Sequence, residues 1–229
     1  YFHDPSYLSL DANNAEYDQH ILTNKAFANW VKRNVKTHKI AGYSSVVLSL
    51  KKPGVAPGDA TSEQMDFVAD LADKFSFGEL RVTHEQNLVL ADVQIAHLHA
   101  LWLEAKAHGL ATPNIGLLTD MICCPGGDFC SLANAKSIPL SAAIADKLAP
   151  IEDDLGPIAI NVSGCINACA HHHVGHIGVL GVEKAGEDWY QVLVGGRPTG
   201  AGRLGVLIGK AVRQADVPRI IDRLARHYL

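Results

Sequence analysis

The sequence predicts an α+β fold in which helices cover the faces of β-sheets, and three observations support this. Helical and strand patterns alternate through both halves of the chain. With 229 residues, of which 48% are hydrophobic, the chain can form one large domain or two small ones. Five cysteines in the second half set that half apart from the first.

The first half has the element order strand, helix, two strands, helix. A strand is predicted over Tyr43–Leu50, and a helix over Thr61–Phe75 begins with a capping box formed by Thr61 and Gln64. Two short strands, Leu80–Thr83 and Asn87–Leu90, follow with a polar break between them. The second helix, Gln94–His108, ends before Gly109. This order is a fragment of a ferredoxin-like arrangement of layers. A further helix is predicted over Asn24–Val35, and residues 1–22 are predicted as an irregular linker arm.

The second half is predicted to hold a cysteine loop, helices and three strands. The predicted helices are Leu132–Lys136, Ser141–Leu148 and Val217–Leu229, and the predicted strands are Pro157–Val162, Ile177–Val182 and Trp189–Val194, with Glu183–Glu187 as a turn. We therefore expect two units. Residues 1–112 form the arm and the ferredoxin-like unit, and residues 113–229 form an α+β unit that carries the cysteines.

Composition argues against several classes of protein. The net charge is −4 with 19% charged residues, so the chain lacks the basic stripe of a nucleic-acid binder. No apolar run reaches the ~18 residues of a membrane span. The start, Tyr1–Pro5, has neither the basic residues nor the apolar stretch of a signal peptide. We expect a cytoplasmic protein.

All five cysteines lie between positions 123 and 169, in two tight groups. A secreted disulfide framework spreads its pairs along the chain and would leave one thiol over here. Counted from Cys124, the spacing is C-x5-C, 34 intervening residues, then C-x3-C. Four thiolates are the usual ligands of a [4Fe–4S] cluster, and Gly126 and Gly127 allow the backbone to approach a bulky core. Zinc is disfavoured because the paired cysteines of structural zinc sites are usually separated by fewer residues than the five between Cys124 and Cys130. The flanking glycines argue against buried cysteines with a purely structural role.

Two stretches carry a family resemblance. The C-x5-C pair followed by Gly164-Cys165-Ile166-Asn167-Ala168-Cys169 resembles the signature of sirohaem and [4Fe–4S] sulfite and nitrite reductases. The run Cys165–Gly178 is similar to the bacterial assimilatory sulfite reductase haemoprotein, and Gly78–Leu88 resembles a second element of the family. The resemblance covers nearly the whole chain but only the C-terminal half of such an enzyme.

The resemblance implies specific roles for the residues at matching positions. The cluster ligands would be Cys124, Cys130, Cys165 and Cys169. Cys169 would also be the catalytic iron's proximal ligand, joining the cluster to sirohaem, and Cys123 would be the spare thiol. The further sirohaem-binding residues implied are Arg81, Gln86, Asn87 and Asn167. The implied reaction is the six-electron reduction of sulfite to sulfide, with nitrite reduction to ammonia as the alternative.

Several interpretations stay open at this point. Arg81 could equally be an ordinary surface arginine, and Asn167 could donate toward the cluster or only shape its turn. We interpret His171–His173 and His176 as packing or solvent-facing side chains rather than metal ligands. Lys136 is explained by a solvated helix face, and Gly195–Gly202 lacks the helix start of a phosphate loop.

The resemblance implies that the anion-binding cations and much of the sirohaem clamp come from an N-terminal half, which we expect to lie outside these 229 residues. We therefore expect the chain to be a fragment or a split subunit that is inactive alone, with a flavoprotein or a ferredoxin as electron donor. The rival hypothesis is a stand-alone [4Fe–4S] electron-transfer module.

Overall fold

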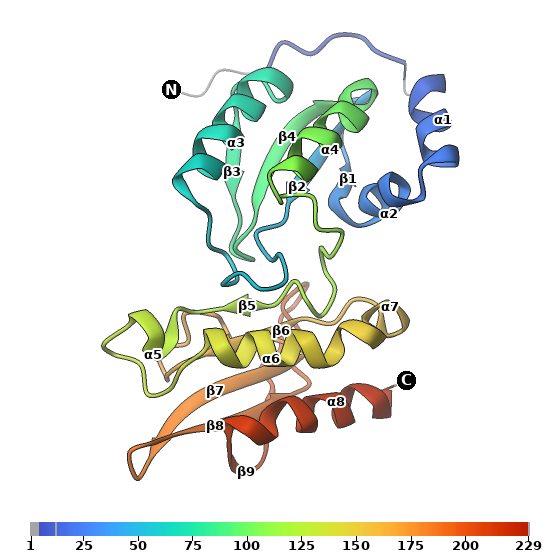
Figure 1. Cartoon of the computed structure of the whole chain (residues 1–229). Coiled ribbons are helices and arrows are strands. Elements are labelled where there is room, and N and C mark those ends of the chain that lie inside the picture. The colour runs from blue at the N-terminus through green and yellow to red at the C-terminus, as the bar shows by residue number, and fades with distance from the viewer. Residues whose placement is uncertain (1–4, 12, 229) are drawn as a thin grey trace. The chain divides into compact units, whose positions relative to one another are not determined.

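The computed structural model describes residues 5–11 and 13–228, and its contacts divide the chain into two compact units. Unit 1 comprises Tyr1–Lys52 and Asp59–Ile115, and unit 2 comprises Pro53–Gly58 and Gly116–Leu229. Each combines helices with one sheet, so the predicted α+β class is confirmed (Figure 1). The predictions on Tyr1–Asp4 and on the last residue, Leu229, lie outside the described residues.

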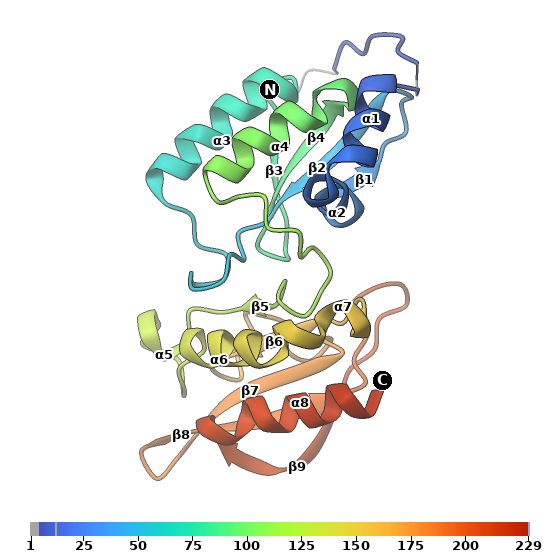
Figure 2. The same cartoon turned by 45° about the vertical axis from the view of Figure 1, so that its right-hand side comes forward.

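Unit 1 is an antiparallel four-stranded sheet in the order β1-β2-β4-β3, with helices packed on it (Figure 2). Its strands are β1 (Val35–Thr37), β2 (Tyr43–Leu48), β3 (Leu80–Val82) and β4 (Leu88–Gln94). Its helices are α1 (Ala15–Thr23), α2 (Lys25–Asn34), α3 (Ser62–Phe75), the 3-10 turn η1 (Ile95–His97) and α4 (Leu98–Ala107).

The core of unit 1 forms where α2, α3 and α4 bury their apolar faces against β2 and β4. Phe27 and Trp30 of α2 are fully buried there, with Leu48 and Leu90 from the sheet. The start of α3 is fixed by the predicted capping box, in which Thr61 Oγ1 accepts from Gln64 N and Gln64 Oε1 accepts from Thr61 N. Local sequence and tertiary packing therefore agree on this helix.

Unit 2 is a mixed five-stranded sheet in the order β5-β6-β7-β8-β9. The first three strands run parallel, and β8 and β9 add antiparallel pairs. The strands are β5 (Ile122–Cys123), β6 (Ile160–Ser163), β7 (Ile177–Lys184), β8 (Glu187–Val194) and β9 (Val206–Arg213). The helices are α5 (Gly126–Phe129), α6 (Ile138–Leu148), η2 (Ala149–Ile151), α7 (Glu152–Leu155), η3 (Gln214–Asp216) and α8 (Val217–Tyr228).

Helices α6 and α8 cover one face of the unit 2 sheet (Figure 2). Leu140 and Ile144 of α6 and Ile221 of α8 are fully buried against Val162 and Val179 of the central strands. The opposite face of β5 and β6 is left for the segments that carry the cysteines, where Ile122, Cys124 and Ala170 form a small separate cluster. One face of this sheet therefore packs against helices to form the core, and the other contacts the cysteine segments.

The structure corrects five details of the predicted elements. Residues 132–136 form turns, not a helix, because Asn134 N and Ala135 N both donate to Gly164 O instead of to their own segment. The arm is not irregular throughout, since α1 begins after Asn14 caps it. Pro157–Ala159 precede the strand that begins at Ile160, and Gln94 ends β4 instead of opening a helix. Strand β9 was not predicted.

Candidate functional site

The carboxyl ends of β5 and β6 bring the two cysteine groups together. These strands pair in parallel, with Cys123 opposite Val162, so the chain leaves both at the same edge of the sheet. Cys124 follows β5 directly, and Gly164-Cys165 follow β6. Gly164 N donates to Cys124 Sγ at 3.1 Å, which joins the two groups by a hydrogen bond. Residues 40 positions apart in sequence thus become neighbours.

Strand alternation separates the two adjacent thiols. Cys123 faces the helix-covered side and belongs to the main core of unit 2, where its Sγ donates to Cys124 O at 3.2 Å. Cys124 faces the opposite side with Ile122. The thiol at position 124 contacts the second cysteine loop through the Gly164 amide. This geometry favours the expectation that Cys123 is the spare thiol.

Glycines allow the two cysteine loops to interleave. A Cβ atom at Gly164 would lie 2.7 Å from Ala135 O and 2.8 Å from Gly126 Cα, closer than real Cβ atoms come. A Cβ at Gly126 would lie 2.4 Å from Ser137 Oγ, and one at Gly181 would lie 2.7 Å from Gly164 O. The backbones at these points pack directly on one another, so side chains are excluded.

The other two cysteines lie on the turns that extend from this contact. Cys130 is half-buried and ends α5, where its N donates to Gly126 O at 2.8 Å. Cys169 is exposed, one residue after Ala168, whose φ of +57° turns the backbone into the left-handed region. Ala168 N donates to Cys165 O at 3.2 Å, which closes that turn. None of the five cysteines, all of which lie within the described residues, forms a disulfide.

The segment after Cys169 is fastened to β6 by Asn161. Its Nδ2 donates to Ala170 O at 2.8 Å and to His171 O at 3.2 Å. His172 follows and is 1% exposed, with its ring stacked on that of His173 at 4.0 Å between centroids. Burial, with a smaller contribution from His173, lowers the pKa of His172 to about 4, so this imidazole is neutral at physiological pH.

The other three histidines of the 171–176 segment, and Asn167, are exposed or half-buried. His171, His173 and Asn167 are exposed. His176 is half-buried, and its Nδ1 accepts from Ala159 N at 2.9 Å, which places its proton on Nε2. Across residues 5–11 and 13–228, no three His, Cys, Asp or Glu side chains are grouped so as to hold a single metal ion.

The edge of the sheet where Cys124 follows β5 and Cys165 follows β6, called the cysteine edge below, has the chemistry of the cofactor that the spacing predicts. An iron–sulfur cluster needs thiolates, room for a bulky core and backbone amides that point at sulfur. The cysteines on two loops that meet at one edge of the sheet supply the thiolates, and the Gly164 amide directed at Cys124 Sγ supplies one such donor. The glycines let these loops pack closely on one another. The chemistry of the donor set therefore fits a cluster.

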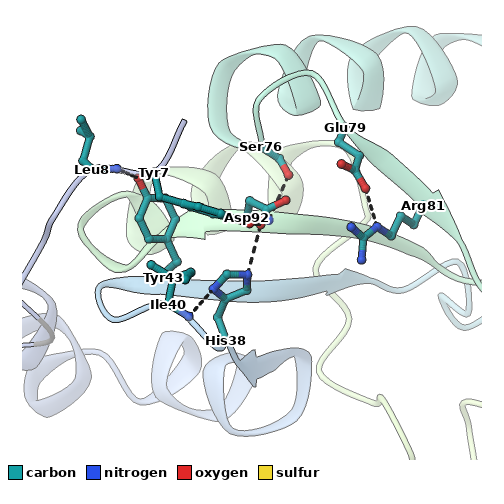
Figure 3. A network of polar contacts seen from close by, with 9 residues as sticks. All are labelled: Tyr7, Leu8, His38, Ile40, Tyr43, Ser76, Glu79, Arg81 and Asp92. Carbon is teal, nitrogen blue, oxygen red and sulfur yellow. Dashed lines mark hydrogen bonds and ion pairs between the residues drawn. The ribbon is translucent and has the colours of Figure 1, made fainter. Parts of the chain in front are cut away.

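The sirohaem-binding residues predicted in the first half lie on the β3–β4 hairpin of unit 1. Arg81 is exposed on β3 and pairs with Glu79, Nε to Oε1, at 2.5 Å (Figure 3). Gln86 sits in the tip of the hairpin with a φ of +59°. Asn87 is buried, and its Oδ1 accepts from Leu50 N at 3.1 Å. Arg81 is thus open to a ligand, while the Asn87 oxygen already holds the backbone of a neighbouring segment.

A buried carboxylate near Arg81 was not found from the sequence. Asp92 on β4 is 2% exposed and accepts from Tyr7 OH at 2.6 Å, and its Oδ1 lies 3.1 Å from His38 Nε2 (Figure 3). His38 Nδ1 accepts from Ile40 N, so Nε2 carries the proton toward Asp92. Hydrogen bonding to Asp92 raises the pKa of Tyr7 to about 12. Asp92 therefore ties the N-terminal arm and the β1–β2 connection to the sheet.

Sequence reasoning also missed Ser137, Gly164 and Asn161 as parts of the cysteine edge. Asn161 carried a signal, because a polar residue on an otherwise apolar buried strand needs a partner. Gly164 was seen in the motif without its packing role. Ser137 had no signal that the sequence alone could provide, since its contact with Cys124 joins residues 13 positions apart across a turn.

Comparisons with known proteins agree with this architecture. Residues 49–108 match the nitrite/sulfite reductase ferredoxin-like half domain, and residues 118–229 match the nitrite and sulphite reductase 4Fe-4S domain. The first match confirms the ferredoxin-like character predicted for the first half. The matched residues contain α3, β3, β4, η1 and α4 of unit 1.

Similar curated proteins include the chloroplastic ferredoxin–nitrite reductase of Arabidopsis thaliana, 29% identical over 87% of this chain and 35% of its own length. The ferredoxin–nitrite reductase of Synechococcus elongatus is 30% identical over 85% of this chain and 38% of its length. Sulfite reductase [ferredoxin] 2 of Mycolicibacterium paratuberculosis is 30% identical over 79% of this chain and 35% of its length.

A solved structure of the Mycobacterium tuberculosis NirA protein matches with a TM-score of 0.68 and 26% identity, covering 84% of this chain and 36% of that one. The chain thus spans little more than a third of the length of the relatives it matches. Two family matches that together cover residues 49–108 and 118–229 show that the chain belongs to the nitrite and sulfite reductase family, which uses a [4Fe–4S] cluster and sirohaem.

Proposed function

We propose that this chain is the cluster-bearing part of a sirohaem-dependent sulfite reductase. The observation that carries the proposal is the meeting of the two cysteine loops at one edge of the unit 2 sheet, tied by the Gly164 amide on Cys124 Sγ. The ligands proposed are Cys124, Cys130, Cys165 and Cys169. Free thiols of this kind need a reducing compartment, which supports the cytoplasm as the location.

Cys169 is proposed as the thiolate shared with the sirohaem iron. Its exposure supports this, because a shared ligand must be reachable from outside the cysteine loops. When bound, the cofactor pair supplies electron storage and a site for stepwise reduction of a small anion. The chain's own contribution is to hold the thiolates, to order the Cys169 turn through Asn161 and to keep His172 neutral beside it.

Residues outside the cysteine ligands are also proposed to contact the cofactors. Asn167 is exposed on the Cys165–Cys169 turn and is proposed to face the cofactor. Arg81 and Gln86 are proposed as sirohaem contacts at the β3–β4 hairpin, with Arg81 supported by its exposure. Asn87 is the weakest of the set, since its Oδ1 already accepts from Leu50 N.

Catalysis is proposed to require the part of the enzyme that corresponds to the remaining length of the relatives. Anion-binding cations and further sirohaem contacts would come from there, so the 229-residue chain alone should be inactive. A ferredoxin is the proposed electron donor, since the similar nitrite and sulfite reductases are both named for ferredoxin.

Nitrite is the second candidate substrate. The specific observation in its favour is the similarity to the ferredoxin–nitrite reductases of Arabidopsis and Synechococcus. The test is to assay the longest natural polypeptide that contains this chain with a reduced one-electron donor and each anion in turn. Sulfide production at the higher kcat/KM supports the proposal, whereas ammonia production at the higher kcat/KM assigns nitrite.

The rival module without a substrate site is tested by absorption spectroscopy of the same polypeptide after anaerobic purification. A Soret band with a red band indicates sirohaem and supports the reductase. A broad shoulder in the blue without porphyrin bands indicates an electron-transfer module and contradicts the proposal. Activity of the 229-residue chain alone would contradict the requirement for a further part.

A further inference from the structure

Ser137 stands immediately before α6, in the position where a serine normally caps a helix. Its side chain makes no capping hydrogen bond, although the residue is 0% exposed. Its Oγ lies 3.5 Å from Cys124 Sγ instead. A buried hydroxyl that gives up a helix cap for a thiol needs an explanation other than helix stability.

The position of this hydroxyl is fixed by glycines on both sides. A Cβ at Gly126 would lie 2.4 Å from Ser137 Oγ, and a Cβ at Gly164 would lie 2.9 Å from it. Both neighbours therefore must lack a side chain for the hydroxyl to reach Cys124. The space for Ser137 is built jointly by the two cysteine loops and the start of α6.

Cys124 Sγ has a second donor on the same side. Gly164 N donates to it at 3.1 Å, so the sulfur has an amide and a hydroxyl within hydrogen-bond distance. A thiol could donate to Ser137, but a thiolate cannot. Once Cys124 is a cluster ligand, the hydroxyl must be the donor and the sulfur the acceptor.

Hydrogen bonds to ligand sulfur stabilise the reduced cluster more than the oxidised one, because the reduced cluster carries more negative charge. We propose that Ser137 is a positioning residue that raises the reduction potential of the cluster by donating its hydroxyl proton to Cys124. This rests on the proposed function, which makes Cys124 a ligand. Ser137 acts through that ligand and does not touch the substrate.

The test compares Ser137→Ala with Ser141→Ala. Ser141 lies one turn further along α6 and is 1% exposed, and its Oγ has no hydrogen-bond partner among the described residues, so it controls for loss of a buried hydroxyl. The chain and both variants are reconstituted anaerobically with iron and sulfide. Their reduction potentials are measured by titration followed by electron paramagnetic resonance.

Ser137→Ala should shift the potential to more negative values and Ser141→Ala should not. An about threefold drop in the ratio of reduced to oxidised cluster at fixed potential corresponds to about 30 mV for a one-electron couple. Ser137→Ala should also lose one exchangeable proton coupling in the resonance of the reduced cluster, which a merely structural role would not remove.

Each other outcome has a distinct meaning. Equal potentials and unchanged couplings in a cluster-bearing Ser137→Ala protein overturn this inference and leave the proposed function standing. A Ser137→Ala protein that takes up no cluster, while Ser141→Ala does, shows a role in assembly and overturns the tuning role. A parent chain that takes up no iron and sulfide overturns the proposed function and this inference with it.

Discussion

Replacing Gly164 with alanine tests directly whether the two cysteine loops depend on close backbone packing. The new Cβ would lie 2.7 Å from Ala135 O, 2.8 Å from Gly126 Cα and 2.9 Å from Ser137 Oγ. Ordinary contacts of a Cβ begin near 3.4 Å, so each neighbour must move by half an ångström or more. Two of the three are backbone atoms and cannot rotate away.

The substitution should lower the free energy of unfolding by about 1 to 3 kcal/mol, the range for overpacking a well-packed interior. A shift of about 1.4 kcal/mol changes the folding equilibrium tenfold, and displacement of the Gly164 amide also weakens its hydrogen bond to Cys124. Gly205→Ala is the matched control, because its Cβ would meet Val194 O at 3.3 Å and nothing closer, away from the cysteines.

The assay is urea unfolding of the protein without cluster, followed by iron and sulfide uptake under anaerobic conditions. Gly164→Ala should lower the free energy of unfolding and reduce uptake, while Gly205→Ala should stay within about 0.5 kcal/mol of the parent. If Gly164→Ala matches the parent in both measurements, the reasoning from backbone packing is refuted.

Three further predictions concern His172, Thr61 and Tyr7. His172 has a folded pKa near 4 against an ordinary value of 6.5, so its contribution to stability is present above pH 6.5 and is lost as pH falls toward 4. The free energy of unfolding of the cluster-free protein, measured in urea, should fall by about 3 kcal/mol over that range, and that of His172→Leu should fall by less, whereas an equal fall would contradict the burial argument. Thr61→Ala should lower thermal stability by about 1 kcal/mol through loss of the capping box, which Thr61→Ser should largely preserve. The pKa of Tyr7 is raised from 10.0 to about 12, so its contribution is present below pH 10 and is lost as pH rises through 12. The difference in ultraviolet titration between the parent and Tyr7→Phe should therefore show one tyrosine ionising near pH 12, and a transition near pH 10 would contradict the Asp92 hydrogen bond.

Local signals in the sequence predicted the elements whose stability is local. The α3 helix was predictable because Thr61 and Gln64 satisfy each other within four residues. Strand β9 was missed because Val206–Arg213 does not alternate and carries Gly209 at a φ of +67°. The false helix over residues 132–136 arose because the amides of Asn134 and Ala135 bond a carbonyl that lies about 30 residues later. Such long-range partners leave no periodic trace in the sequence.

In the candidate site, too, features set by local sequence could be predicted and features set by long-range contacts could not. The cysteine spacing predicted a cluster, and the family resemblance implied Cys124 over Cys123 as a ligand. Strand alternation adds a physical reason to separate these two thiols. What surrounds Cys124 could not be predicted, because the Gly164 amide and the Ser137 hydroxyl reach it only after three segments fold together. Exposure of Arg81 and burial of Asn87 were likewise decided by tertiary packing.

No helix among the described residues is long and apolar enough to cross a membrane. This finding covers residues 5–11 and 13–228.

The measurement that tests the central claim most directly is the iron and acid-labile sulfide content of single cysteine-to-serine variants after anaerobic reconstitution. The parent and Cys123→Ser should each bind about four iron and four sulfide per chain, the composition of one cluster. Cys124→Ser, Cys130→Ser and Cys165→Ser should lose most of it. Retention of the cluster by Cys124→Ser with its loss in Cys123→Ser, or one zinc and no sulfide in the parent, would contradict the account.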